Sequence, residues 1–425
     1  MKPISSLPIS RRSLLTGTAA LAALPSAAQS TSMVTTGAHN PALDSFDRTM
    51  ISFMRKRSIP GGQLAVTRYG RLVYARGYGF ADLERRTPVQ PQSLFRIASI
   101  TKPFTAVAIM TLVQDPRFRL RLDDPAFPMI PLNRKVADPR LNTITIRQLL
   151  HHTGGFDRDK SGDPMFRPLE IAAAEGTPAP ADQWAIIRWM AGRPLDFDPG
   201  TRFAYSNFGY CVLGRVIEAV TAMRYVDYVS KFVLQPMAVR GMRMGRTRLP
   251  DRARGEVRYY QPNARPVPSI FPQDHGELVS VCYGAWNLEA MDSHGAWLAS
   301  APALVRFAAQ LDFPSQPPLL APHTAATLYE PPAAPIKPEG GAWYGCGWEV
   351  RPVGDRGKAN TWHNGSLDGT NTWLVRRWDG LAWAALFNQR DTGNGLSDGE
   401  IDANLHPAAD AVTHWPDYDL FQTGR

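Results

Sequence analysis

Apolar residues recur at steps of three and four along residues 43–54, and this spacing predicts an amphipathic helix that ends before Pro60-Gly61-Gly62. The apolar positions are Leu43, Phe46, Met50, Phe53 and Met54. Two short apolar runs follow on either side of Tyr69-Gly70-Arg71, which favours a tight turn. The chain therefore starts with a predicted helix and a β-hairpin.

Helical and strand patterns occupy separate blocks of the remaining chain. Residues 120–270 contain proline-punctuated loops and helical stretches. One of these stretches places five apolar residues on one face: Val212, Leu213, Val216, Ile217 and Val220. Strand patterns return near residue 345, with Asp379-Gly380 as a turn between two strands, and a helical stretch closes the chain over about 398–415.

This order of elements predicts an α/β (α+β) fold. An antiparallel sheet is expected from both termini, with flanking helices and an inserted, mainly helical region. The α/β part would comprise about 43–115 and 280–425, and the helical part about 116–279. We find no internal repeat.

The first 28 residues have the pattern of a bacterial export signal. Arg11 and Arg12 precede a short apolar stretch, and the small-residue segment Pro25-Ser-Ala-Ala28 predicts cleavage after Ala28. Residues 29–42 are polar and fit a linker to the domain that begins at residue 43. We therefore expect a periplasmic or secreted protein; the alternative is a cytoplasmic protein with a basic end.

Composition excludes several functional classes. The 425 residues are 44% hydrophobic and 20% charged, as in an ordinary globular protein. The formal net charge is +9, and residues 1–28 contribute three of these charges, which leaves +6 without a long basic block. We expect no nucleic-acid partner and no stable membrane insertion. The oligomeric state is open.

The cysteine spacing argues against a zinc site. Cys211, Cys282 and Cys346 allow at most one disulfide, have no zinc-site spacing and are expected to be buried.

Ser99 and Lys102 form the only Ser-x-x-Lys sequence in the chain. Pro103 is tolerated in a first helical turn and places a helix start close to Ser99. Residues three apart share a helix face, so the Lys102 amine would approach the Ser99 hydroxyl. A desolvated lysine can act as a base for a serine nucleophile, whereas arginine cannot, and lysine supplies only eight of the 47 basic residues. The alternative is a helix cap and a solvated lysine.

Two further motifs follow in order. Tyr205-Ser206-Asn207 precedes an amphipathic helix, and His363-Asn364-Gly365 lies on a predicted strand. Together with Ser-x-x-Lys, these resemble the three motifs of the serine β-lactamase and penicillin-binding-protein family. The Tyr-x-Asn form is typical of its class C β-lactamase-like branch, which includes D-amino-acid peptidases and carboxylesterases. The resemblance extends over about 43–415.

The resemblance implies roles for individual residues. Ser99 would be the nucleophile, and Lys102 and Tyr205 would share the acid and base work. Asn207 would hold the lysine and a substrate amide. Gly365 would leave room for a substrate along the strand. The backbone N–H groups of Ser99 and Ser366 would form the oxyanion hole.

One position departs from the family pattern. His363 stands where the family has a lysine, and a histidine near pH 7 is mostly neutral. This weakens an assignment as β-lactamase or D-alanyl-D-alanine carboxypeptidase, because those substrates carry a carboxylate, although Arg376 or Arg377 could supply the charge. We expect an exported serine hydrolase that cleaves an ester or amide in a small molecule or peptide, as an esterase or peptidase. The alternative from another class is a non-catalytic binding or sensor protein.

No cofactor or metal is expected. His151 and His152 are adjacent and therefore poorly placed to bind one ion, and no third ligand has a fitting spacing. Six tryptophans could line an apolar cleft or pack in the core: Trp286, Trp297, Trp343, Trp348, Trp362 and Trp373.

Overall fold

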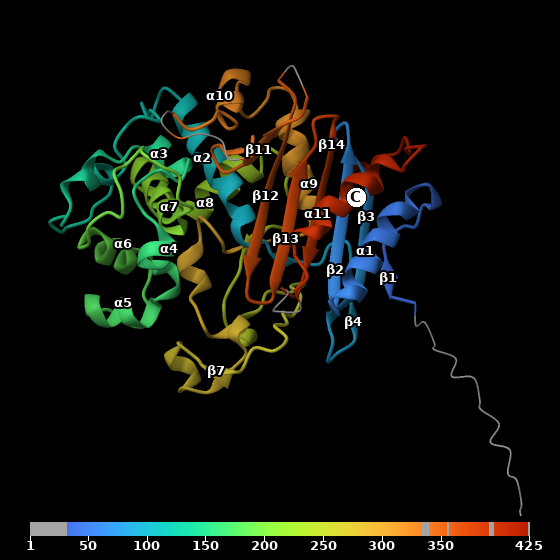
Figure 1. The fold of residues 1–425 in the computed structure, drawn as a ribbon, viewed down its shortest axis with the longest axis horizontal. Helices are drawn as coiled ribbons and strands as arrows, with labels where there is room; N and C mark the ends of the chain where they lie inside the picture. The colour runs from blue at the N-terminus through green and yellow to red at the C-terminus, as the bar shows by residue number, and fades with distance from the viewer. Residues whose placement is uncertain (1–31, 334–335, 337–339, 355–356, 391–394, 424–425) are drawn as a thin grey trace, which may run out of the picture. The chain divides into compact units, whose positions relative to one another are not determined.

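A nine-stranded antiparallel sheet organises residues 33–425, which form one unit of the computed structural model (Figure 1). The structure describes residues 32–423 except 334–335, 337–339, 355–356 and 391–394, so the predicted signal peptide lies outside the described residues. The sheet order is β1-β3-β2-β14-β13-β12-β11-β10, with β4 paired to β3. N-terminal and C-terminal strands meet at β2 and β14, as predicted.

The strands of this sheet come from both ends of the chain. They are β1 (Thr35–Thr36), β2 (Gly61–Arg68), β3 (Arg71–Asp82), β4 (Thr87–Pro88), β10 (Trp343–Tyr344), β11 (Glu349–Pro352), β12 (Ala359–Leu367), β13 (Thr370–Arg376) and β14 (Leu381–Phe387). The predicted hairpin is β2–β3, where Tyr69 and Gly70 both have positive φ, the backbone that a two-residue turn of this kind needs. Short strands outside this sheet are β5 (Phe95–Arg96), β6 (Arg243–Met244), β7 (Val267–Pro268), β8 (Leu278–Val279) and β9 (Trp297–Ala299).

Helices cover both faces of the sheet. The predicted first helix is α1 (Asp44–Lys56), and it packs with α11 (Glu400–Asp410) over one face in a core that contains Phe46, Met50 and Leu405. On the opposite face α9 (Ala301–Asp312) contacts β2 and β14. Beside it lies α2 (Thr101–Gln114), which is buried on all sides from Thr101 to Leu112. Such a helix has no solvent face and forms the centre of the larger core.

The predicted helical region lies next to this second face (Figure 1). Its helices are α3 (Ile146–Leu150), α4 (Arg158–Ser161), α5 (Pro168–Glu175), α6 (Gln183–Ala191), α7 (Asn207–Thr221) and α8 (Tyr225–Val229). The apolar face predicted for residues 212–220 is that of α7, which packs against α2 and α3. Two short helices, α10 (Pro322–Thr327) and α12 (Leu420–Thr423), follow later. None of the described helices is long and apolar enough to cross a membrane.

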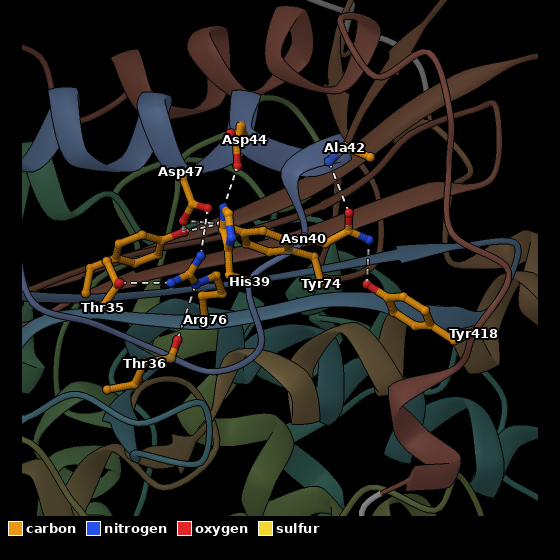
Figure 2. A network of polar contacts seen from close by, with 11 residues as sticks. Thr35, Thr36, His39, Asn40, Ala42, Asp44, Asp47, Tyr74, Arg76 and Tyr418 are labelled. Carbon is orange, nitrogen blue, oxygen red and sulfur yellow. Dashed lines mark hydrogen bonds and ion pairs between the residues drawn. The ribbon is translucent and has the colours of Figure 1, made fainter.

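The segment predicted as a linker is partly built into the sheet. Thr35–Thr36 pair with β3 as strand β1. Figure 2 shows how polar contacts fix this segment: Arg76 binds Asp47 and Thr35, and His39 binds Asp44. Pattern analysis misses such a two-residue strand because its partner, β3, supplies most of the ordering.

Both oxygens of the Asp47 carboxylate in this network already accept hydrogen bonds. It accepts hydrogen bonds from Arg76, Tyr74 and Tyr78. His39, Asp44 and Asp47 are the one described group with the spacing of metal ligands, but Asp47 is used here to neutralise Arg76.

Candidate active site

Ser99 lies in a tight turn, Ala98–Ile100, directly before α2. Ala98 has φ +47, a conformation that costs free energy in a residue with a side chain and that the surroundings must enforce. The Ile97 N–H donates to the Trp297 carbonyl at 3.0 Å, and the Ile97 carbonyl accepts from Thr372 Oγ1 at 3.0 Å. The predicted helix start at Ser99 is confirmed.

Lys102 is completely buried one helical turn after Ser99. Its Nζ donates to Ser99 Oγ at 3.0 Å, to Asn207 Oδ1 at 2.8 Å and to the His294 carbonyl at 3.2 Å. Burial lowers the pKa of this amine well below its ordinary value, and Arg158 lowers it further, whereas the negative charge of Asp163 opposes the shift. The alternative of a solvated lysine is wrong.

Tyr205 and Asn207 bring the second motif to the same place. Asn207 is the first residue of α7, capped by Ser206, and its Oδ1 receives the Lys102 amine. Tyr205 lines the same cleft as Ser99, and its ring lies 4.8 Å from Lys102 Nζ. Burial raises the pKa of the Tyr205 phenol, which is therefore protonated at neutral pH.

The third motif lies on β12, where His363 is buried and neutral. Its Nδ1 donates to the Asn364 carbonyl at 2.6 Å, so Nε2 is the acceptor for the Tyr344 hydroxyl at 2.9 Å. Burial and the nearby Lys102 lower the pKa of His363 to about 3. It supplies no positive charge near pH 7.

The packing of β12 itself requires a glycine at position 365. A Cβ at this position would lie 2.2 Å from the Ile97 carbonyl oxygen and 2.4 Å from Thr372 Oγ1. The glycine thus lets β12 approach the turn that carries Ser99.

These residues line one cleft of about 550 Å³, which suits a small-molecule ligand. All three motifs reach it through Ser99, Tyr205, Asn207, His363 and Ser366. Lys102 lies beneath the cleft and contacts it through Ser99 and Asn207. A larger cavity of about 910 Å³ at the other end of α2 contains none of the motif residues.

Several residues at the site were not identified from the sequence. Arg158 lies over the Tyr205 ring at 4.6 Å, and Asp163 accepts from Asn207 Nδ2 at 2.7 Å. Glu349 lines the cleft, and burial raises its pKa to about 7. Tyr344 binds His363 from an edge strand. No local signal marks these residues, because each reaches the site from a separate segment.

Comparison with known proteins agrees with this arrangement. The Beta-lactamase family model matches residues 46–405. The chain belongs to the β-lactamase family. The family and the α/β fold predicted from the three motifs are therefore confirmed.

Curated relatives of this β-lactamase-family chain match over part of their length. Protein flp of Staphylococcus aureus (strain N315) is 30% identical over 198 residues, which cover 47% of this chain and 37% of flp. Esterase EstB of Burkholderia gladioli is 34% identical over 192 residues, which cover 44% of this chain and 47% of EstB. The chain thus matches less than half of either relative.

A solved structure shows the same fold over more of the chain. The penicillin-binding protein homologue from Pyrococcus abyssi aligns with a TM-score of 0.66 at 24% identity, over 88% of this chain and 78% of that one.

Two arginines that the sequence left open as carboxylate ligands are paired elsewhere in the structure. Arg376 is buried and paired with Asp312 of α9, and Arg377 pairs with Asp379 and Asp410. Their partners lie on α9, in the β13–β14 turn and on α11, and neither arginine is among the described residues that line the cleft. The described cations lining the cleft are instead Arg158 and Arg390.

The two adjacent histidines do not converge on one point. His151 Nε2 contacts Cys346 Sγ at 3.2 Å, whereas His152 Nδ1 accepts from the Ser206 N–H at 3.1 Å. The His152 ring packs on Tyr205 with centroids 4.2 Å apart, so it supports the second motif.

The tryptophans and cysteines belong to packed regions. Trp286, Trp297 and Trp348 are in the core, and none of the six tryptophans is among the described residues that line the cleft. All three cysteines are buried, as predicted, and all three are free, a point that the sequence left open.

Proposed function

We propose that this chain is an exported serine hydrolase that cleaves an ester or amide through an acyl-enzyme on Ser99. The observation that carries the proposal is the 3.0 Å contact between Ser99 Oγ and a fully buried lysine amine, placed at a small-molecule cleft. Family membership and the similarity to an esterase support it.

The two candidate proton carriers are electrostatically different. Burial lowers the pKa of Lys102, so the neutral amine is available to accept the Ser99 proton. Burial raises the pKa of Tyr205, so its phenol is available to donate. We therefore assign the base role to Lys102 and the acid role to Tyr205, which lines the same cleft as Ser99.

The proposed reaction has two stages. Ser99 Oγ attacks the substrate carbonyl as Lys102 takes its proton, and the backbone N–H groups of Ser99 and Ser366 stabilise the resulting oxyanion. Tyr205 donates a proton to the leaving alcohol or amine, and the C–O or C–N bond breaks to leave the acyl-enzyme. Water then attacks the ester carbonyl with the same groups in reverse roles and releases the acid.

The cleft favours substrates with an apolar part. Phe166 and Phe203 line it although each is 42% exposed, and Met291 and Leu367 line it too. His363 offers no cation, which supports the esterase or peptidase assignment over the β-lactamase alternative. The β-lactamase alternative would need Arg158 or Arg390 to bind the substrate carboxylate, and Arg390 is already paired with Asp368.

The test compares the mature protein with Ser99→Ala, with Ser315→Ala as an exposed serine control. Each protein is incubated with a fluorophosphonate, a fluorescent penicillin and p-nitrophenyl esters, and intact mass and hydrolysis are measured together. We expect labelling and ester turnover in the wild type and the control but not in Ser99→Ala, whose thermal unfolding should be unchanged.

Other outcomes assign other functions. A durable penicillin adduct on Ser99 would favour the penicillin-binding alternative, and rapid β-lactam turnover would favour a β-lactamase. Full ester turnover by Ser99→Ala would refute the mechanism. The absence of any Ser99-dependent signal would favour the binding or sensor protein.

Export is proposed from the twin-arginine pattern alone. Residues 1–35 fused to a reporter should direct it to the periplasm, and Arg11→Lys with Arg12→Lys should prevent this. A reporter that stays in the cytoplasm with the native arginines would contradict the proposal.

A further inference from the structure

Asn207 has two different partners, one on each side of its amide. Its Oδ1 accepts from Lys102 Nζ at 2.8 Å, and its Nδ2 donates to Asp163 Oδ2 at 2.7 Å. The amine and the carboxylate together permit a single amide orientation. The Asn207 NH2 must face Asp163, which accepts, and the Asn207 oxygen must face Lys102, which donates. Asp163 thus fixes the orientation of the Asn207 amide from the side opposite Lys102.

Asp163 is itself held in place. It lies in the connection 158–166, which comprises α4 and the turn Pro164–Phe166, and its Oδ1 accepts from the Met165 N–H at 3.0 Å. Both carboxylate oxygens are therefore used, one for its own turn and one for Asn207. The same connection carries Arg158, over the Tyr205 ring, and Phe166, at the cleft.

We propose that Asp163 is a positioning residue for the reaction: it holds the Asn207 amide with its oxygen toward Lys102, and it places a negative charge near the lysine amine. This rests on the proposed roles of Ser99 and Lys102. Nothing in the family motifs includes this position.

The side chains around Lys102 are mostly neutral, so the effect of Asp163 on the Lys102 pKa can be measured. The lysine is surrounded by three histidines and two tyrosines from four segments: His152, His294, His363, Tyr205 and Tyr210. Burial lowers the pKa values of these histidines and raises those of these tyrosines, so all five are neutral near pH 7. Asp163 and Arg158 are left as the charged groups that act on the lysine, with opposite signs.

The sign of the effect follows. Asp163 stabilises the protonated amine, so removing its charge lowers the Lys102 pKa further. If neutral Lys102 is the base, the acidic limb of the reaction rate then moves to lower pH.

Two substitutions separate positioning from a structural role. Asp163→Ser keeps a side-chain cap for the Met165 N–H but removes the charge and the contact to Asn207. Asp163→Asn keeps the shape, but its single oxygen cannot serve both partners. When that oxygen caps the Met165 N–H, the new NH2 group faces Asn207 Nδ2, and two donors oppose each other. The Asn207 amide must then turn its oxygen toward residue 163 and its nitrogen toward Lys102.

The experiment measures the rate of fluorophosphonate labelling of Ser99 by intact mass from pH 5 to 10. We expect the acidic limb to shift to lower pH in both variants. At high pH, Asp163→Ser should react within a few-fold of the wild type, whereas Asp163→Asn should be roughly tenfold to a hundredfold slower because of the mismatched donors. A purely structural role predicts the opposite order, since asparagine is the closer replacement.

The matched controls are Asp159→Ser and Asp159→Asn. Asp159 is on the same connection with its side chain 93% exposed, and these changes should leave the rate and the limb unchanged. An unshifted limb, or an Asn variant as reactive as the Ser variant, would overturn the role of Asp163 while leaving Ser99 as the nucleophile. A wild type that is not labelled would instead overturn the proposed function, and this inference with it.

Discussion

Two fully buried cations flank the proposed nucleophile, and their surroundings are opposite. Arg96, three residues before Ser99, donates to the carbonyls of Cys282, Arg246 and Thr247, and its Nε lies 3.6 Å from Glu256 Oε1. Lys102, three residues after Ser99, has only neutral hydrogen-bond partners. Glu256 is thus a counterion for the buried guanidinium, whereas no described carboxylate contacts the Lys102 amine.

The difference separates structure from chemistry. A buried cation with an anion and several acceptors stays charged and holds segments together, and Arg96 joins β5 to residues 246–247 and 282 in this way. A buried amine without a contacting anion is driven toward its neutral form, which can accept a proton. At the same sequence distance from Ser99, Arg96 is therefore a structural anchor and Lys102 is a candidate base.

The largest expected effect is on catalysis at Lys102. Lys102→Met should lower the rate of Ser99 acylation by roughly 10²-fold to 10⁴-fold, because the serine loses its base. The free energy of unfolding should fall by no more than about 1 kcal/mol, since the removed group was a desolvated amine. Acylation is measured with p-nitrophenyl esters and unfolding with urea. Lys102→Arg should be as inactive, because arginine does not release its proton, and an active Arg variant would exclude the base role.

Arg96 should show the reverse pattern. Arg96→Met should lower the free energy of unfolding by roughly 3 to 5 kcal/mol, because it leaves Glu256 buried without its cation. Chemical denaturation measures this loss. The double variant Arg96→Met, Glu256→Gln should recover part of it, and a double variant no more stable than the single one would show that the ion pair is not the cause.

Tyr205 tests whether Lys102 acts alone. Tyr205→Phe keeps the ring that packs on His152 and removes the hydroxyl, so turnover should fall by roughly 10²-fold through loss of the proton donor. Tyr210→Phe is the matched control, because its ring also faces Lys102 but its hydroxyl donates to the Leu150 carbonyl instead. Equal activities of the two variants would remove Tyr205 from the mechanism. Because burial raises the Tyr205 pKa, the wild type should show no loss of activity from phenol ionisation below about pH 10.

Glu349 extends the comparison to a half-buried acid and carries the smallest expected effect. Its pKa is raised by burial to about 7, so the folded protein binds this proton more tightly than the unfolded chain does. Stability should therefore fall as pH rises from about 4.5 to 7, and Glu349→Gln should gain on the order of 1 to 3 kcal/mol at pH 8. Below pH 4.5 the two proteins should unfold alike. Urea titrations at pH 8 and pH 4 measure the difference, and an equal gain at both pH values would exclude ionisation as the cause.

The elements that sequence patterns predicted are those with local causes. The α1 and α7 helices follow from apolar spacing, the β2–β3 hairpin from a turn sequence, and the α2 start from Pro103. Residues with non-local causes escaped the sequence. Asp163 meets Asn207 across 44 positions, and β1 is ordered by its partner strand. The same limit left the role of Arg376 open, since Asp312 of α9, not the strand pattern, directs its side chain.

By itself the sequence determined the family, the order of the elements and the three motifs, because these depend on residue types and short spacings that are the same in any environment. Only the tertiary structure decided the protonation states and contacts of those residues. It brought Lys102 and Asn207 together across 105 positions, made His363 neutral and, among the described residues, left Lys102 without a contacting carboxylate. Desolvation and contacts between distant segments decide protonation, and neither is a property of a short stretch of chain.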